Sequence, residues 1–172
     1  KKRLIIEARK EDYQGKRFTS ARLASKQAWK YGRFEVVAKL PAGRGSWPAI
    51  WMLPEPMGRW PLCGELDIME HVGYDPGRIH HTVHTEDFNH TKGTQKGQNH
   101  LVTDFDKAFN TYAMDWRESR ITFLVDGKEQ FVFDNISGAT EEQWPFDKQF
   151  SFRLNRAVGG HWGFAKGVDE AI

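Results

Sequence analysis

Three carboxylates lie within six residues of an otherwise apolar segment, Glu65-Leu66-Asp67-Ile68-Met69-Glu70. In a regular strand, side chains alternate between two faces, so Glu65 and Asp67 share one face and Glu70 points to the other. A β-bulge at Ile68-Met69 would add one residue and bring Glu70 to the same face. At about 3.3 Å per strand step, the Cα atoms of Glu65 and Glu70 would then lie roughly 13 Å apart. Side chains that lean inward could reach the carboxyl spacing of about 5–5.5 Å that retaining glycosidases use.

In such enzymes one carboxylate is the nucleophile and the other serves in turn as acid and base. Asp67 between them would raise the pKa of a neighbour by repulsion, or share a proton with it. Two other interpretations exist: the carboxylates could form the solvated outer face of an edge strand, or part of a calcium site. No Lys or Arg alternates with these acids, so a solvated face would carry uncompensated repulsion. The pattern therefore favours a catalytic strand.

The elements that must position these acids have the period-two alternation of β-strands, with turn residues between them. Many short strands predict an all-β sandwich or barrel. Asp126-Gly127 supplies the chemistry of a two-residue hairpin turn, and residues 140–144 are expected to form a short helix or turn. The predicted strands are residues 4–8, 19–23, 33–40, 49–53, 65–70, 79–85, 111–117, 121–125, 130–133 and 150–158, and residues 86–97 form the longest predicted irregular stretch.

Length and composition indicate one globular domain covering residues 1–172, without linkers or repeats. The net charge of +2 and the interleaved signs argue against a nucleic-acid binder. The apolar runs are far shorter than the roughly 20 residues of a transmembrane helix, so we expect no membrane span. A single cysteine, Cys63, excludes an intrachain disulfide and a zinc cluster of thiolates.

The segment from Glu65 to Glu70 resembles the bulged catalytic signature of glycoside hydrolase family 16, in its laminarinase-like endo-1,3-β-glucanase branch. Further blocks resemble that branch in order and spacing: residues 31–35, 39–41, 45–53, 60–61, 83–85, 144–147 and 155–160. The resemblance implies a concanavalin-like jelly-roll β-sandwich. Two antiparallel sheets would carry a glycan cleft on the concave face, and hydrolysis would retain the anomeric configuration.

By motif position, the resemblance implies that Glu65 is the nucleophile, that Glu70 is the acid/base, and that Asp67 tunes the pair. His84, on the next predicted strand, is a fourth catalytic candidate because it could hydrogen-bond Glu70 or the leaving group. Aromatic rings suit the apolar face of a pyranose and polar side chains suit its hydroxyls. The substrate-binding candidates are Arg33, Glu35, Trp47, Trp51, Trp60, Asn89, Trp144, Asn155 and Trp162.

No cofactor is expected for catalysis, and no metal ligands are assigned. His80, His81, His84 and His90 are close in sequence, but strand alternation separates His81 from His80 and His84. Relatives carry further strands before and after the blocks seen here, so we expect a sandwich that lacks N- and C-terminal strands. A structural calcium ion is possible in the full-length domain.

The expected function is endo-acting hydrolysis of internal β-1,3 bonds in laminarin-like β-glucans by double displacement. Alternatives are a hydrolase of mixed-linkage β-glucan or algal galactan, or a non-catalytic β-glucan-binding protein. Val37, Arg156 and His161 depart from the family pattern and leave the substrate preference open. A polysaccharide substrate and the resemblance imply a secreted, periplasmic or cell-surface protein, and the oligomeric state stays unassigned.

Overall fold

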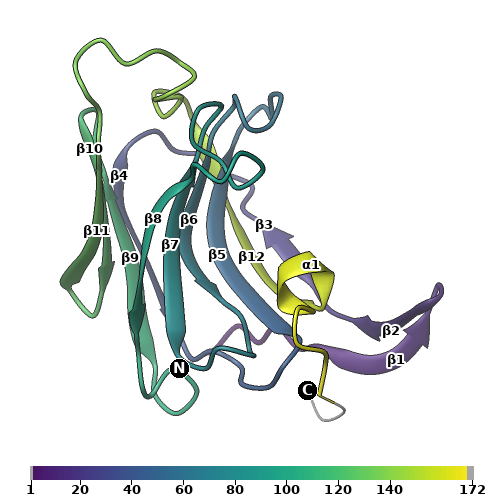
Figure 1. The fold of residues 1–172 in the computed structure, drawn as a ribbon. Helices are drawn as coiled ribbons and strands as arrows, with labels where there is room; N and C mark the ends of the chain where they lie inside the picture. The colour runs from purple at the N-terminus through teal and green to yellow at the C-terminus, as the bar shows by residue number, and fades with distance from the viewer. Residues whose placement is uncertain (1, 170–172) are drawn as a thin grey trace.

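The computed structural model describes residues 2–169, which form a two-layer β-sandwich with an outlying hairpin (Figure 1). One layer is an antiparallel sheet of six strands in the order β3-β12-β5-β6-β7-β8, and the other has four in the order β11-β10-β9-β4. The strands are β1 (Arg9–Tyr13), β2 (Lys16–Thr19), β3 (Arg22–Ala24), β4 (Gly32–Ala38), β5 (Ser46–Pro54), β6 (Glu65–His71), β7 (Arg78–His84), β8 (Lys96–Leu101), β9 (Asn110–Trp116), β10 (Arg120–Val125), β11 (Lys128–Asp134) and β12 (Phe150–Val158). The one-turn helix α1 (Gly160–Gly163) follows β12.

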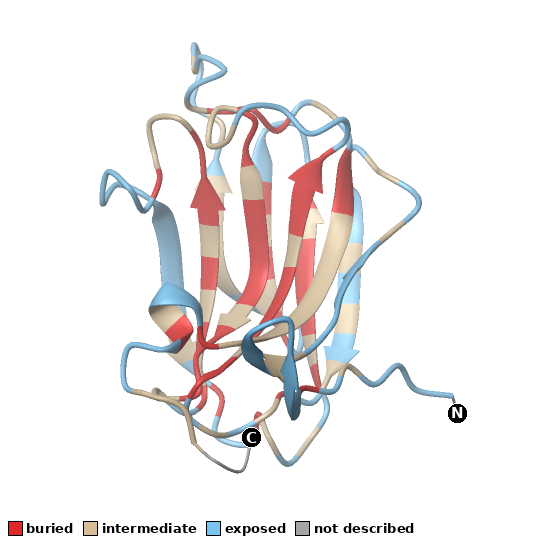
Figure 2. Ribbon diagram, turned by 90° about the vertical axis from the view of Figure 1, so that its right-hand side faces the viewer, coloured by how far each residue is buried: buried red, intermediate tan, exposed pale blue. Residues whose placement is uncertain are grey.

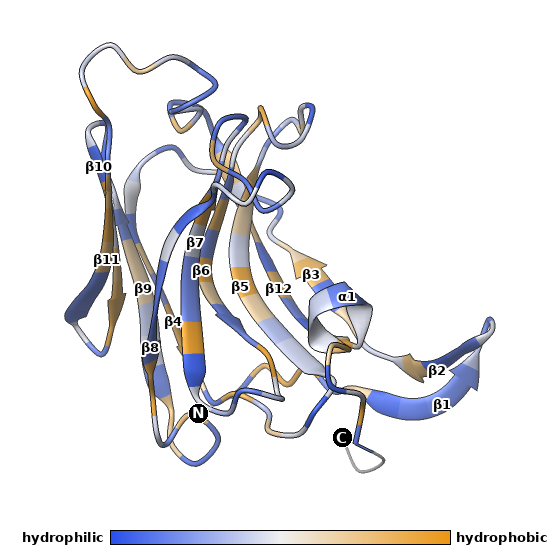
Figure 3. Ribbon diagram, in the orientation of Figure 1, coloured by the Kyte–Doolittle hydropathy of each residue, from blue (hydrophilic) through white to orange (hydrophobic). Residues whose placement is uncertain are grey.

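The hydrophobic core lies between the two sheets, where apolar side chains alternate along the strands (Figures 2 and 3). The six-stranded sheet contributes side chains such as Met52, Leu66 and Ile79, and the facing sheet contributes Tyr112 and Phe123, all inaccessible to solvent. Burial of apolar surface on both layers is the main force that holds two such sheets together. This packing holds the inner face of the six-stranded sheet rigidly, so the outer face of the same sheet can carry polar groups.

A β-bulge interrupts β6 at the predicted position. Asp67 pairs with Thr82 of β7 while Glu70 pairs with His80, so three steps on β6 match two steps on β7. The pairing with β5 shifts at the same place, between Ile50 and Trp51. Both bulge residues, Ile68 and Met69, are buried in the core. The extra residue therefore turns Glu70 to the face that carries Glu65 and Asp67.

Most of the predicted strands are present, and the differences lie at largely exposed segments. Residues 4–8 have no regular structure, and the predicted strand 19–23 covers the end of β2 and the start of β3. A turn lies within residues 140–144, which is one of the two forms expected there. The hairpin of β1 and β2 projects away from the sandwich (Figure 1). Strand β8 occupies an edge of the six-stranded sheet, and its exposed polar residues have no apolar alternation. No helix among residues 2–169 is long and apolar enough to cross a membrane.

Candidate active site

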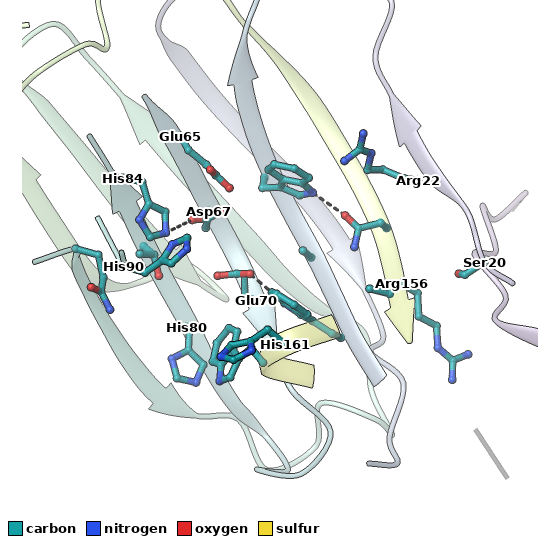
Figure 4. Close-up of a pocket in the computed structure, with 18 of the residues that line it drawn as sticks. Ser20, Arg22, Glu65, Asp67, Glu70, His80, His84, His90, Arg156 and His161 are labelled. Atoms are coloured by element: carbon teal, nitrogen blue, oxygen red, sulfur yellow. Dashed lines mark hydrogen bonds and ion pairs between the residues drawn. The ribbon is translucent and has the colours of Figure 1, made fainter. Parts of the chain in front are cut away.

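A cleft of about 890 Å³ lies on the face of the six-stranded sheet that is turned away from the four-stranded sheet. Strands β5, β6, β7 and β12 form its floor, and α1 and the segment before β3 border it (Figure 4). The three carboxylates of β6 face this cleft together. Its other lining residues are Ser20, Ala21, Arg22, Trp47, Ala49, Trp51, His80, Thr82, His84, His90, Gln95, Asn155, Arg156, Ala157, His161 and Trp162.

Each carboxylate faces a definite residue of β7 across the strand pair. Glu65 pairs with His84, Asp67 with Thr82, and Glu70 with His80. Side chains directly opposite on antiparallel strands stand about 4.5–5.5 Å apart at Cβ and interact. The register thus gives every acid its own polar neighbour on β7.

Two tryptophans each donate an indole N–H to one of the outer carboxylates. Trp60 Nε1 donates to Glu65 Oε2 at 2.5 Å, and Trp47 Nε1 donates to Glu70 Oε1 at 3.0 Å. An indole N–H can only donate, so it stabilises a carboxylate more than a neutral acid. The two bonds fix the orientation of the two carboxyl groups.

The two outer carboxyls have different protonation tendencies. Burial raises the pKa of Glu70 to about 7, the Trp47 hydrogen bond opposes this, and the charge of Glu65 adds to it. Burial also raises the pKa of Glu65 above its ordinary value of 4.5, and the hydrogen bonds from Trp60 and Asp67 offset part of that rise. Glu70 is therefore suited to hold a proton near neutral pH, and the two hydrogen-bond donors to Glu65 favour its ionised form, as the acid and the nucleophile of such a pair require.

Asp67 lies between these two groups and is itself buried. Burial, followed by the charges of Glu65 and Glu70, raises its pKa well above the ordinary value of 3.8. A protonated Asp67 donates to Glu65, which accounts for its lowering of the Glu65 pKa. His84 Nε2 lies 3.4 Å from Asp67 Oδ2, and burial lowers the pKa of His84 to about 4, so this imidazole is neutral.

Of the two partners expected for His84, Glu70 is wrong, and a contact with the leaving group stays a prediction. His84 stands opposite Glu65 and approaches Asp67, while His80 occupies the place opposite Glu70. The bulge lies between Asp67 and Glu70. The partner of Glu70 on β7 is His80, which is four residues before His84 in the chain. His84 is therefore placed to orient Asp67 and Glu65.

Aromatic side chains form the wall on the Glu70 side of the cleft. The Trp162 ring meets the Trp47 ring edge to face at 5.5 Å and the His80 ring at 4.9 Å. A Cβ placed on Gly160 or Gly163 would lie 3.2 Å from Trp47, so these glycines let α1 lie flat against that indole. Helix α1 thus backs the tryptophan that holds Glu70.

The opposite part of the floor is built on β12 and β5. Trp51 Nε1 donates to Asn155 Oδ1 at 2.7 Å, and the Arg22 guanidinium lies 5.9 Å from the Trp51 ring centre. This contact fixes the plane of the Trp51 ring, with the Asn155 amide nitrogen beside it. An aromatic ring with neighbouring hydrogen-bond donors matches the two kinds of surface of a sugar.

The structure brings most predicted site residues into the cleft. Glu65, Asp67, Glu70, His84, Trp47, Trp51, Asn155 and Trp162 line it, and Trp60 borders it through its bond to Glu65. The Trp60 ring also lies 5.1 Å from the His90 ring, which reaches the cleft from the loop after β7.

Four predicted substrate contacts lie elsewhere. Arg33 and Glu35 are exposed on β4 of the other sheet, where they form an ion pair of 2.6 Å with each other. Trp144 is buried in the core and stacks on Phe133 at 5.3 Å. Asn89 is fully buried and donates to the carbonyls of Thr85 and Glu86. It organises the loop that carries His90, so its contribution to the site is indirect.

Several cleft residues were not among the predicted site residues, namely His80, Thr82 and His90 on or after β7, Arg156 and His161, and Ser20 to Arg22. His80 and Thr82 share the strand face of His84, so the alternation that selected His84 also points to them. The segment before β3 gives no such signal, because only the folded chain brings it beside β12. Among residues 2–169, no three or more His, Cys, Asp or Glu side chains gather in an arrangement that could hold a metal ion.

Comparison with known proteins gives a family match over nearly the whole chain. The sequence model described as Glycosyl hydrolases family 16 matches residues 2–171. The chain is 48% identical over 176 residues to the beta-glucanase of Rhodothermus marinus, covering 96% of this chain and 62% of that protein. The crystal structure of the R. marinus laminarinase superimposes with a TM-score of 0.91 at 46% identity, over 94% of this chain and 68% of the other.

A second similar structure contains a sugar. It is a variant of SCLam, a non-specific endo-beta-1,3(4)-glucanase, co-crystallised with 1,3-beta-D-cellotriosyl-glucose, with TM-score 0.90 and 42% identity. The match covers 95% of this chain and 67% of that one. These likenesses confirm the all-β jelly-roll sandwich. The chain spans 62% of the length of the R. marinus beta-glucanase and about two thirds of the length of the chains in the two similar crystal structures.

Proposed function

The chain belongs to glycoside hydrolase family 16, and on that basis we propose that it is an endo-acting, retaining glycosidase of internal β-1,3-glucosidic bonds in laminarin-like β-glucans. One observation carries the proposal. Two carboxyls of one strand face a common cleft, and each accepts an indole N–H. Burial raises the pKa of Glu70 to about 7, and a second donor, Asp67, favours the ionised form of Glu65. This is the arrangement that double displacement at an anomeric carbon requires.

In the first step a Glu65 oxygen attacks the anomeric carbon, and the bond from that carbon to the glycosidic oxygen breaks. Glu70 gives its proton to the departing oxygen, so the leaving sugar departs as an alcohol. Trp60 keeps the Glu65 carboxylate oriented. The product is a glycosyl ester on Glu65 and an ionised Glu70.

In the second step Glu70 takes a proton from a water molecule, whose oxygen attacks the anomeric carbon and releases Glu65 as a carboxylate. The electrostatics favour this exchange, because the charge of Glu65 is one cause of the raised pKa of Glu70. Esterification removes that charge, and the pKa of Glu70 falls. The same group can then act as acid in the first step and as base in the second.

The substrate class rests on the cleft and on the similar proteins. The cleft is lined by Trp47, Trp51 and Trp162 together with polar groups, which suits a chain of pyranose rings. One relative is a laminarinase and another is a non-specific endo-beta-1,3(4)-glucanase, so mixed-linkage glucan is the second candidate substrate. A β-glucan polysaccharide as substrate implies action outside the cytoplasm.

We place Asp67 and His84 as groups that orient Glu65, and assign no cofactor to catalysis.

The test is product analysis by chromatography after incubation with laminarin and, separately, with mixed-linkage β-glucan. Internal cleavage of laminarin should give a ladder of oligosaccharides whose newly formed ends keep the β configuration by NMR. Glu65→Gln should release none of them and still bind the glucan. A wild-type protein that binds laminarin and releases nothing would instead be a glucan-binding protein.

A further inference from the structure

His81 is a buried histidine that the two displacement steps do not use. It lies on β7 between His80 and Thr82, which face the cleft, but its own side chain points into the sandwich and is 1% exposed. There it packs on Phe123 of the facing sheet at 5.6 Å and lies parallel to the ring of His100 at 5.1 Å. No sugar in the cleft can touch it.

The polar contact of His81 is with the backbone of the catalytic strand. Its Nδ1 lies 2.6 Å from the carbonyl oxygen of Ile68. A carbonyl oxygen only accepts, so Nδ1 carries the hydrogen and donates it. Burial lowers the pKa of His81 to about 4, so the ring is neutral and Nε2 has no hydrogen. Ile68 is 1% exposed, and a buried carbonyl that loses its donor is costly.

Ile68 is one of the two bulge residues, and His81 is the residue of β7 that stands opposite them. Asp67 pairs with Thr82 and Glu70 with His80, which leaves His81 facing Ile68 and Met69. A bulge disrupts the ladder locally. The imidazole of His81 supplies a hydrogen-bond donor to the Ile68 carbonyl in the bulge. It does so from the interior of the sandwich, on the side away from the cleft.

We propose that His81 is a positioning residue that fixes the bulge through the Ile68 carbonyl and thereby places Glu70 for proton transfer. The inference rests on the proposed function. Glu65 and Asp67 precede the bulge and pair with β7 in regular register, whereas Glu70 follows it. Loss of the His81 donor should therefore act on the acid/base and much less on the nucleophile.

Two substitutions of His81 form a matched pair. In Asn the amide nitrogen is two bonds from Cβ, as Nδ1 is in histidine, so His81→Asn keeps an N–H donor near Ile68. Leu places a methyl group there, so His81→Leu has a similar size and no donor. Both variants lose the contact with His100, and their difference isolates the hydrogen bond.

On laminarin, His81→Leu should lower kcat about 10–100-fold, since small displacements of a catalytic group cost that much. Its KM should stay within about threefold, and His81→Asn should keep kcat within about fivefold of the wild type. An aryl β-glycoside with a good leaving group needs little proton donation. Its burst of released phenol should therefore be nearly as fast in His81→Leu as in the wild type.

A merely structural residue would behave differently. Equal kcat in the two variants, with only a lower Tm, would overturn the proposal, and so would an equal loss of the burst and of laminarin turnover in His81→Leu. If His81→Leu does not fold, His81→Gln replaces it in the same comparison. The Gln amide is one bond further from the backbone and is displaced from the Nδ1 position.

A readout without substrate separates this inference from the proposed function. The Glu70 carboxyl can be titrated by carbon-13 NMR in the wild type and both variants. Its midpoint should move in His81→Leu and stay in place in His81→Asn, and identical midpoints in all three proteins would overturn the positioning role. A wild type that cleaves no glucan would refute the proposed function alone.

Discussion

Trp60 donates its indole N–H to Glu65 Oε2 at 2.5 Å, from a position five residues earlier in the chain. The bond opposes the rise in the Glu65 pKa that burial causes. The same ring lies 5.1 Å from His90 and 6.0 Å from His84. Trp60 therefore combines packing with an electrostatic effect on the nucleophile, and a substitution can separate the two.

Trp60→Phe keeps an aromatic ring beside His90 and removes the N–H donor. The pKa of Glu65 should then rise, because the donor stabilises the ionised carboxylate. Glu65 must be ionised to attack, so the acidic limb of kcat/KM against pH should move to higher pH. Profiles measured between pH 3 and 9 would show it, and an unmoved acidic limb would contradict the assignment.

Glu70→Gln removes the proton donor and leaves the shape of the site. Turnover of laminarin should fall by about 10²–10⁴-fold, the usual contribution of a general acid or base. With an activated aryl β-glycoside the phenol burst should persist and deglycosylation should become slow. In the wild type, kcat/KM should decline as pH rises through about 7, because Glu70 loses its proton there. Loss of the burst as well would argue against an acid/base role.

The same carboxyl also affects stability. Because burial raises the pKa of Glu70 from 4.5 to about 7, the folded state binds more protons than the unfolded state between these values. The contribution of Glu70 to the free energy of unfolding is therefore complete below pH 4.5 and is lost as pH rises through about 7. Gln does not titrate, so the Glu70→Gln variant does not lose this stability as pH rises. Its free energy of unfolding relative to the wild type should increase by about 2 kcal/mol from pH 5 to pH 8. Urea unfolding at both pH values measures this, and a constant difference would rule it out.

Gly64 precedes the catalytic strand with φ of +85°, and a Cβ there would lie 2.8 Å from Pro145 Cγ and 3.0 Å from Phe146 Cε1. Gly64→Ala should therefore destabilise the protein by about 2–4 kcal/mol through strain and overpacking. Thermal unfolding measures the loss. Gly127→Ala is a useful control, because it also has a positive φ of +78° and no atom within 4 Å of the added Cβ. Equal losses in the two would show that backbone strain alone is responsible.

Local sequence was sufficient to predict the catalytic strand. The spacing of Glu65, Asp67 and Glu70 is inconsistent with a regular strand that faces one cleft, and the bulge resolves this as expected. Alternation also correctly separated His81 from His80 and His84. Both inferences depend on neighbours along one strand, where the period of two governs which side chains share a face.

Contacts that depend on tertiary arrangement could not be predicted in this way. Alternation places Arg33 and Glu35 on one face of a strand, but it does not say which sheet that strand joins. Trp144 could equally suit a rim or a core, and the stacking on Phe133 decides for the core. For Asn89, the backbone carbonyls of its own loop compete with a sugar for the amide.

Strand β8 and the hairpin of β1 and β2 were missed for a different reason. Residues 96–100 are polar and bury little surface, since they form the edge of the sheet. Strand β1 is exposed along its whole length, so no buried face sets its pattern. Only backbone pairing defines such strands, and the periodicity of their side chains does not reveal that pairing.

Because of the bulge in β6, the active site should tolerate the deletion of one residue from this strand better than the insertion of one. Deletion of Ile68 or Met69 would restore a regular strand in which the third carboxylate still stands opposite His80, on the same face as Glu65 and Asp67. Insertion of one residue into the regular part of β6 between Glu65 and Asp67 would instead turn one carboxylate from the cleft toward the core. A lineage can thus shorten this strand and keep its acids, whereas a lengthened copy could retain all three carboxylates in its sequence and have lost the site.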